Sequence, residues 1–516
     1  MSVTTAMSVT TAMSSALSER TAKSTAMSGR TAKSTALSQA AAKSTAMRSL
    51  TAFTASLCAV LLLAGCASFP TTAAKVRDAE PAAPQLDIQS WRTAQGARVL
   101  FVASDALPML DVRLVMDAGS ARDGDQPGLA ALTSALLGEG AEGLDVDQIA
   151  SGFEDKGARF STGSYQDMGV ISLRTLSKPA WRDASVDLLA RVIGQPDFPE
   201  PALQRIRTQM MQGMRMNQQV PGPQVSDAFL NTVFGEHPYG HPSSGTLDSL
   251  PAIQRADLRA FYQHYYAAGN AVIALVGDVN RAQAERIAER LSAALPQGGP
   301  AADLPRAQRL TRQTVRHLEF PSAQTHILIG NQATWRGNPD HAALYVGNYI
   351  LGGGGFASLL TREVRERHGF VYGISSYFKP MAAGGPFLLQ LQTANDNADQ
   401  ALGLTLRILD DFIANGPTDE QLENAKANIL GSMALATADN SDIIGQLGAI
   451  GFYDLPLDYL KEFNQRVKAV TVADIQNAFR RALDPDRLAI VSIGPKAPQV
   501  PARPQSSSDE NQGQNQ

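Results

Sequence analysis

Histidine side chains are the residues whose type and spacing could bind a metal in this chain. His237 and His241 are four positions apart, and Glu236 precedes the first of them. That spacing would place two imidazoles on one face of a helix, but Pro238 and Gly240 stand between them and disfavour a regular helix. The other histidines have no spacing typical of metal ligands: His264, His317, His326, His341 and His368. The residues themselves therefore give no metal site.

A segment further upstream leads to the same conclusion. Residues 128–140, GLAALTSALLGEG, resemble the signature region of the M16 metallopeptidases, the pitrilysin-like inverted zincins. In that family an H-x-x-E-H helix holds zinc through two histidines one turn apart, and the glutamate between them acts on water. The corresponding positions here are Ala131, Ser134 and Ala135. A methyl group has no lone pair for a metal, and a hydroxyl is not a carboxylate base.

The family's third zinc ligand, a glutamate on a later helix, is also missing. The resemblance places it within Gln209–Gly213, which contains no acidic residue. Between Glu200 and Glu236 the one acidic residue is Asp227, which follows the break at Pro221-Gly-Pro. All four functional positions are therefore changed together. The resemblance implies a chain without metal or other cofactor, with zinc expected in a partner subunit.

A second functional element of the family is retained. Residues 350–372, ILGGGGFASLLTREVRERHGFVY, resemble its glycine run followed by an Arg/Tyr pair, and Arg365 and Tyr372 match that pair at its spacing of seven. In active members the pair reaches from the C-terminal half-domain to the zinc-bound substrate. A guanidinium and a phenol can donate hydrogen bonds to a peptide carbonyl and to the negative oxygen that develops on it. The resemblance thus implies that both residues are catalytic in a partner's site.

Structural interpretations of the same segment stay open. Arg362–Glu366 and Glu363–Arg367 could form ion pairs along a charged helix face, and Tyr372 could be a packed strand residue. The glycine run lacks the G-K-[ST] continuation of a phosphate-binding loop. We expect it to form a turn between a closely packed strand and helix, or to contact a peptide. The residues expected to bind substrate are Gly353, Gly354 and Gly355.

Two segments of similar plan must position these residues. Alternating apolar strands, apolar-periodic helices and a buried closing strand occur in each. In the first, the clearest elements are strands at 97–102, 110–117 and 271–277 and helices at 128–137, 180–193, 200–218, 255–266 and 280–294. In the second, they are strands at 326–330, 387–393 and 487–493 and helices at 339–351, 398–415, 418–436 and 472–482. The similar closing strands favour a duplication.

The fold class follows from this plan and from the resemblance. We expect an α+β protein with two tandem M16-type half-domains, each an antiparallel sheet covered by helices. The first half-domain, with the degenerate zinc motif, spans 88–296, and the second, with the Arg/Tyr motif, spans 307–496. The Pro/Gly-rich stretch 297–306 is the expected linker.

The N-terminal region predicts export. Residues 47–66 contain a positive charge, a short apolar run and the sequence Leu-Ala-Gly-Cys, and this layout resembles a bacterial lipoprotein signal peptide. The resemblance implies a lipidated Cys66 as the membrane anchor. Ala67 after the cysteine favours the outer membrane, and we expect the protein to face the periplasm.

The flanking segments are not expected to fold. Residues 1–46 repeat TAKSTA-like text that cannot build a core. Either translation begins at Met47, which we favour, or these residues form an unusually long start of the signal. Residues 67–87 are a Pro/Ala-rich tether, and 497–516 are expected to be a disordered tail.

The composition excludes several classes of function. A net charge of −4 over 516 residues gives no electrostatic case for nucleic-acid binding. The two cysteines, Cys58 and Cys66, both lie in the signal segment, so the folded part has neither a disulfide scaffold nor a cysteine-built zinc site.

Two functions of different class remain. The favoured one is the non-catalytic subunit of a heterodimeric M16 peptidase, which pairs with an H-x-x-E-H subunit and acts on peptides or small unfolded proteins. The alternative is a pseudoprotease scaffold or peptide-binding lipoprotein without a role in catalysis. In either case we expect this chain alone to be inactive as a peptidase.

Overall fold

The computed structural model describes residues 86–501. The expected low-complexity segment 1–46, the signal segment 47–66 with Cys66, and nearly all of the tether 67–87 lie outside the described residues. Within the described range, none of the helices has the length and apolar character needed to cross a bilayer. The first residues of the expected tail are ordered against the second half-domain: Gln499 donates its backbone N–H to Asp399, and Val500 packs on the core.

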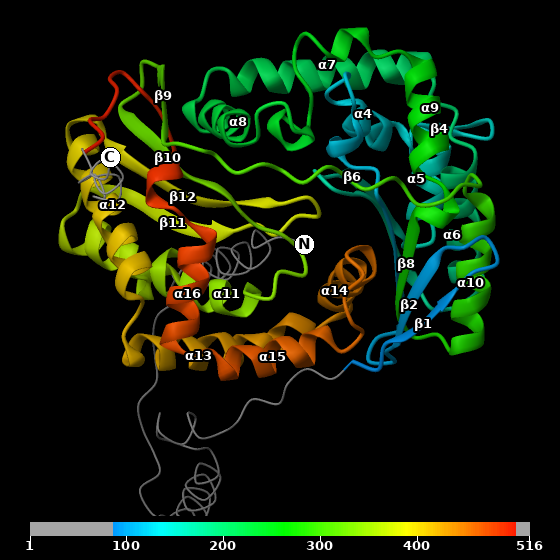
Figure 1. Ribbon diagram of the computed structural model, residues 1–516. Helices are drawn as coiled ribbons and strands as arrows, with labels where there is room; N and C mark the ends of the chain where they lie inside the picture. Colours follow the sequence, from blue (N-terminus) through cyan, green and yellow to red (C-terminus); the bar gives the residue numbers. More distant parts are fainter. Residues whose placement is uncertain (1–85, 502–516) are drawn as a thin grey trace, which may run out of the picture. The chain divides into compact units, whose positions relative to one another are not determined.

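The first half-domain is built on a six-stranded sheet (Figure 1). Its strands lie in the order β1-β2-β8-β3-β7-β6. Their bounds are β1 Gln89–Arg92, β2 Arg98–Ala103, β8 Ala271–Gly277, β3 Met109–Met116, β7 Gly169–Leu176 and β6 Arg159–Ser164. A separate two-stranded ribbon joins β4 (Gly140–Ala141) and β5 (Leu144–Asp145). The predicted closing strand is β8, and every residue in it is buried.

The second half-domain is built on a five-stranded sheet in the order β11-β12-β10-β13-β9. Its strands are β11 Val371–Phe378, β12 Gly385–Ala394, β10 Gln324–Thr334, β13 Ala489–Gly494 and β9 Thr314–Glu319. The predicted closing strand is β13, which is also buried throughout.

The two sheets share one topology, which supports the duplication. The order β2-β8-β3-β7-β6 in the first sheet has the same connections and directions as β9-β13-β10-β12-β11 in the second. The α+β class is therefore confirmed, but the sheets are mixed rather than antiparallel throughout. Each contains one parallel pair, β2 with β8 and β13 with β9. The parallel pair arises because the closing strand of each half returns, after a long crossover, beside an early strand of that half, β2 in the first and β9 in the second.

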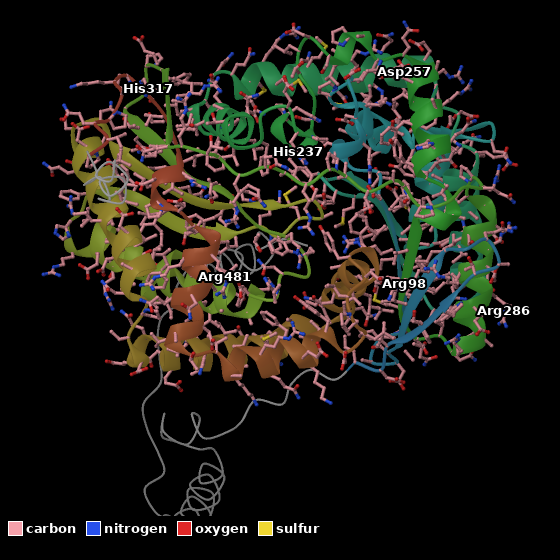
Figure 2. The ribbon with its side chains drawn as sticks, in the orientation of Figure 1. Arg98, His237, Asp257, Arg286, His317 and Arg481 are labelled. Atoms are coloured by element: carbon pink, nitrogen blue, oxygen red, sulfur yellow. The ribbon has the colours of Figure 1, made fainter. Side chains whose placement is uncertain are left out.

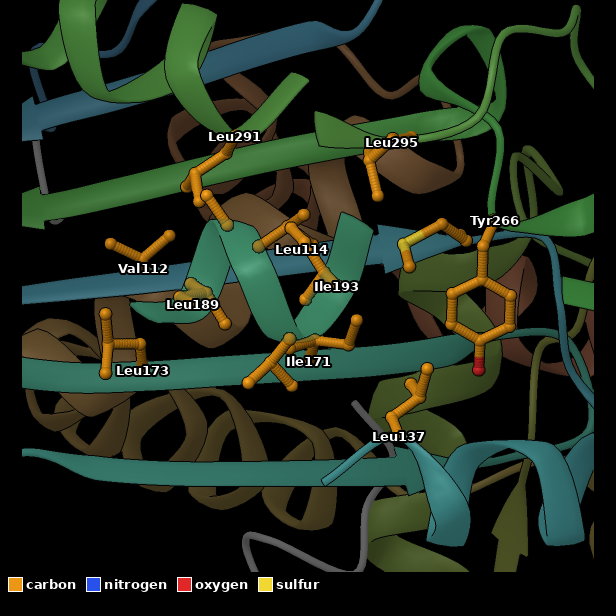
Figure 3. Close-up of a cluster of buried hydrophobic side chains, with 14 of the residues drawn as sticks. Val112, Leu114, Leu137, Ile171, Leu173, Leu189, Ile193, Tyr266, Leu291 and Leu295 are labelled. Atoms are coloured by element: carbon orange, nitrogen blue, oxygen red, sulfur yellow. The ribbon is translucent and has the colours of Figure 1, made fainter. Parts of the chain in front are cut away.

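Helices cover one face of each sheet. Those of the first half-domain are α4 Leu129–Leu136, α5 Val146–Glu154, α6 Pro179–Gly194, α7 Glu200–Asn217, α9 Arg255–Tyr265 and α10 Arg281–Ala294. Figure 3 shows Leu189 and Ile193 of α6 and Leu291 of α10 against Val112 and Ile171 of the sheet. Those of the second are α11 His341–Asn348, α12 Ala398–Asn415, α13 Asp419–Met433, α15 Tyr459–Ala469 and α16 Val472–Ala482.

Each half-domain also lends one helix to the other. Helix α14 (Asn440–Phe452) comes from the second half but packs on β2, β3 and β8 of the first sheet. Its Ile444 and Leu447 are buried with Leu100 and Val272. Helix α8 (Pro221–Phe234) comes from the first half and packs on β10 and β13. The strands beneath α14 and α8 are thereby covered on both faces, which explains the continuous burial of β8 and β13.

A buried polar cluster joins the two halves. The Asp167 carboxylate, in the β6–β7 hairpin, accepts hydrogen bonds from the hydroxyls of Tyr239 and Tyr453 and, at 3.0 Å, from the backbone N–H of Ala382. The Tyr239 hydroxyl in turn accepts the N–H of Ala383 at 3.1 Å. Burial and the Asp167 charge raise the pKa of Tyr239, so its hydroxyl remains a proton donor.

The predicted linker is held against both halves. The backbone carbonyl of Gly298 accepts the N–H of Gly269, and Ala301 donates its N–H to the side chain of Asn270 at 3.0 Å. Just beyond it, Ala307 donates its N–H to Ala383 of the second half. The linker therefore contributes to the junction between the halves.

The close approach of α14 to the first sheet can be tested at Gly451. A Cβ atom there would lie 2.3 Å from Val272 Cγ1 and 2.9 Å from Leu100 Cδ1. We expect Gly451→Ala to lower the free energy of unfolding by roughly 1–3 kcal/mol through overpacking, measured by urea denaturation.

The matched control is Gly431→Ala in α13, where a Cβ meets nothing within 4 Å. That change should be neutral or stabilising by up to about 1 kcal/mol, because alanine favours helix over glycine. Equal stability of the two variants would contradict the packing of α14 on the first sheet.

Candidate functional site

The helix that resembles the zinc helix is α4, and its side chains do not fit a metal. Ala131 is half-buried, Ser134 is buried at 3% exposure, and Ala135 is exposed. None of the three offers a nitrogen or carboxylate ligand. The buried Ser134 is part of the packing: its backbone carbonyl accepts a hydrogen bond from Thr162 of β6 at 2.8 Å.

The position of the third ligand lies on α7, which packs beside α4. In the stretch 209–213 the two glutamines are exposed, while Met210 and Met211 pack against the core of the first half-domain. Helix α8, which carries Asp227, begins at Pro221, so the predicted break Pro221-Gly-Pro forms its first turn and α7 ends before it, at Asn217. Across residues 86–501, the structure brings together no group of three or more His, Cys, Asp or Glu side chains that could hold a metal ion.

The His237–His241 segment forms a short 3-10 turn, Pro238–Gly240, and no α-helix, as its sequence predicts. His237 uses both ring nitrogens within the protein. Nδ1 accepts the N–H of Tyr239 at 3.1 Å, and Nε2 donates to the carbonyl of Pro305 at 2.8 Å. Figure 2 labels His237 at this position beside the linker. The turn therefore serves to join the halves through Tyr239 and Pro305.

Sequence reasoning missed Asp123, which supports the N-terminus of α4. Its carboxylate accepts the backbone N–H groups of Gly128 and Ala130, each at 2.7 Å. The side chain is buried, and its nearest basic group is His241 Nδ1 at 4.0 Å. Burial raises the pKa of Asp123 to about 7, although the two N–H donors act in the opposite direction.

Arg365 lies on the π-helical segment η8 (Thr361–Arg367) and is exposed. Its guanidinium carbon is 5.2 Å from the centroid of the Phe356 ring, a cation–π arrangement. In the part of the chain that the structure describes, no carboxylate is within ion-pair distance of Arg365. The charge is therefore available to another molecule.

Tyr372 lies in β11 at the free edge of the second sheet. The pairing with β12 is irregular between Val371 and Gly373, so Tyr372 occupies a β-bulge, a feature that redirects a side chain. Its side chain is 61% exposed, whereas Val371 is buried. This exposure does not fit the alternative of a packed strand residue.

The alternative of an ordinary charged helix face is met in part. Glu363 pairs with Arg367 at 3.2 Å, as that alternative expects, and with Arg362 at 3.6 Å instead of the expected Arg362–Glu366 pair. These pairs lie beside Arg365 and do not include it.

The glycine run forms the turn that brings a helix close to β11. A Cβ on Gly352 would lie 2.4 Å from Ser376 Oγ, and one on Gly353 would lie 2.6 Å from Asn348 Nδ2. Gly354 donates its N–H to Tyr349 at 2.8 Å within the π-helical turn η6 (Tyr349–Gly353). Gly355 has a φ of +60° and open space around its Cβ position. Gly352 thus has the structural role, while Gly353 and Gly355 are exposed beside Phe356.

The elements that carry Arg365, Tyr372 and Phe356 contact one another: β11 contacts η8 and η6, and η8 contacts η7 (Gly355–Ala357). Tyr372 therefore lies on the edge strand of the second sheet, and Arg365 lies on the π-helical segment that contacts this strand. They can donate hydrogen bonds to a carbonyl or an oxyanion, but among the described residues no group of three or more His, Cys, Asp or Glu side chains that could hold a metal ion lies with them.

The titration of Asp123 gives a test of the support beneath α4. A folded-state pKa near 7, above the ordinary value of 3.8, means that the native state holds a proton that the unfolded state has released. The contribution of Asp123 to stability is therefore fully present below about pH 4 and is lost as the pH rises to about 7.

We expect the difference in unfolding free energy, wild type minus Asp123→Asn, to fall across this window by about 1 kcal/mol per pH unit, measured by urea denaturation at several pH values. Asp125→Asn, at an exposed carboxyl two positions away, supplies the baseline. A difference that does not vary with pH would contradict a protonated, buried Asp123.

Two family models match consecutive segments of the chain. Residues 98–247 match the family model described as insulinase (peptidase family M16), and residues 252–429 match that of the peptidase M16 inactive domain. The chain is 46% identical to the solved peptidase M16 inactive domain from Pseudomonas fluorescens, with a TM-score of 0.78 over 81% of this chain and 100% of that one.

Some curated relatives are named as non-peptidase homologues and others as zinc proteases. The chain is 26% identical to a non-peptidase homologue of Helicobacter pylori, over 72% of this chain and 89% of the relative. It is 28% identical to an uncharacterized zinc protease of Streptomyces coelicolor, over 70% and 79%. With both half-domains matched, this chain belongs to the M16 peptidase family, and its relatives there include an inactive domain and a non-peptidase homologue as well as a zinc protease.

Proposed function

We propose that this chain is the non-catalytic subunit of a heterodimeric M16 zinc metallopeptidase that acts on peptides or small unfolded proteins. In this proposal Arg365 and Tyr372 complete the zinc site of a partner subunit that bears H-x-x-E-H. The observation that carries it is a contrast within the chain. The residues at the metal positions of α4 cannot bind zinc, while Arg365 and Tyr372 are both exposed, on two elements that contact each other.

The chemistry assigned to this chain is hydrogen-bond donation. When a peptide carbonyl is attacked, negative charge develops on its oxygen, and donors already in place stabilise that charge without reorganisation. The Arg365 guanidinium is always charged, and no ion pair with a described residue neutralises it. The metal and its water belong to the partner in this proposal.

The proposal includes a location. A lipidated Cys66 would anchor the chain at the outer membrane, facing the periplasm, with the two half-domains following the tether 67–87. A multiply acylated cysteine binds a bilayer firmly, because each buried methylene contributes about 0.8 kcal/mol.

The existence of a partner can be tested directly. The chain is purified with an affinity tag from its native cell, and zinc is measured in the complex and in the isolated chain. We expect zinc and an H-x-x-E-H protein in the complex, and no stoichiometric zinc in the chain alone. A complex without any zinc-bearing M16 subunit would instead favour the pseudoprotease scaffold.

The role of Arg365 is tested in the reconstituted pair. Arg365→Ala should leave assembly intact and lower kcat/KM by about 10²–10³-fold, the usual cost of losing one preorganised donor. Tyr372→Phe, which removes one hydroxyl, should act in the same direction.

Arg362→Ala is the matched control, because Arg362 lies on the same segment but pairs with Glu363. It should retain nearly full activity. Unchanged turnover in Arg365→Ala, with assembly verified by size-exclusion chromatography, would refute the assigned role.

A further inference from the structure

Phe356 is a large aromatic side chain that the fold leaves in water. It is 69% exposed, although burying such a ring would contribute about 1.5–3 kcal/mol to folding. Among the described residues, the other phenylalanines are buried or partly buried; Phe356 follows Gly355, which has a φ of +60°. Because it is exposed, the Phe356 ring contributes little to the stability of the fold.

The loop that carries Phe356 is nevertheless firmly held. Ser358 is fully buried, and its hydroxyl donates to the carbonyl of Gly355 at 2.7 Å and contacts Thr361 Oγ1 at 3.0 Å. The backbone N–H groups of Ala357 and Ser358 donate back to Gly354 and Gly355. The ring is thus presented on a closed turn at the start of the segment that carries Arg365.

The Phe356 ring lies next to the Arg365 guanidinium. A cation over an aromatic face is attracted by the ring quadrupole, at a centroid distance of up to about 6 Å; here the distance is 5.2 Å. A carboxylate partner would hold Arg365 too, but it would occupy its N–H donors and cancel its charge. The ring restrains the guanidinium and leaves the N–H groups free.

We infer that Phe356 is a positioning residue for Arg365: its ring holds the guanidinium in a fixed orientation while leaving the donors free for a substrate oxyanion. The inference rests on the proposed function for its catalytic consequence, and on the Phe356–Arg365 geometry for its structural one. Because oxyanion donation acts in the transition state, loss of the ring should lower kcat with little change in KM.

The structural part is tested on the chain alone, by NMR of the arginine Nε–Hε groups. The Arg365 signal is identified by its disappearance in Arg365→Lys. Phe356→Leu should remove the ring-current shift of that signal and increase its mobility, and Phe356→Tyr should restore both. An Arg365 signal that is identical in Phe356→Leu and wild type would overturn the inference.

The control variant is Trp181→Leu. Trp181 on α6 is 39% exposed, and Lys178 Nζ lies 5.0 Å from its ring centroid. The Trp181→Leu variant therefore removes a comparable cation–π contact in the other half-domain. The Arg365 signal should not respond to it.

The catalytic part is tested in the zinc-bearing heterodimer. We expect Phe356→Leu to lower kcat about fivefold at unchanged KM, the effect of a cation–π contact of about 1 kcal/mol, and Phe356→Tyr to restore the rate. Full kcat in Phe356→Leu within an active heterodimer would overturn the catalytic role. If wild-type chain yields no peptidase with any partner, the proposed function fails, and the NMR arm still decides whether Phe356 positions Arg365.

Discussion

The exchange of α8 and α14 between the two half-domains is the constraint on which the structure depends. The central strands β8 and β13 are apolar on both faces, so each sheet needs a cover on both sides. The helices that follow each sheet in sequence cover one face, and the other face is covered by a helix from the opposite half. Neither half can bury its sheet alone. The Asp167 cluster then closes the junction, where two tyrosine hydroxyls and a backbone N–H satisfy a carboxylate that would otherwise be buried at high cost.

This junction also fixes the position of α4 relative to Arg365 and Tyr372. Helix α4 lies on the first sheet, and Arg365 and Tyr372 lie at the free edge of the second. A chain whose halves exchange helices holds these two places in a fixed relation. In the proposed heterodimer, the zinc site that uses Arg365 is supplied by the partner subunit. The exposed edge strand β11 and the open surroundings of Gly355 leave that side of the second half-domain accessible.

The sequence predicts the elements with clear local periodicity. It misses the helices whose pattern is completed across the junction, and also α5 and α15, which pack within their own half-domains. The closing strands and the long helices α6, α7, α10 and α12 have clear apolar periodicity and lie near their expected ranges. Helices α8 and α14 were not expected, because their apolar faces and the close-packing Gly451 make sense only against a sheet of the other half. The parallel pairs were missed for the same reason, since strand order is a property of the whole crossover. At the site, the motif located Arg365 and Tyr372. The roles of Asp123, Asp167 and Phe356 depend on burial and on neighbours distant in sequence, which no local pattern shows.

The candidate site residues of the two half-domains differ in how much they contribute to folding. In α4 the positions that correspond to the family's metal ligands carry two alanines, of which Ala135 is exposed, and a buried serine. Asp123 satisfies N–H groups at the helix start, so Ser134 and Asp123 contribute to packing there. At the edge of the second sheet the opposite holds. Phe356, Arg365 and Tyr372 are all exposed, so they add little to folding, yet Ser358, the glycine turn and the β-bulge hold their backbone in place. An ordered backbone that presents exposed polar and aromatic side chains is typical of a binding surface. The position that resembles the zinc helix therefore serves packing in the first half-domain, while the exposed groups of the second accord with the proposed site.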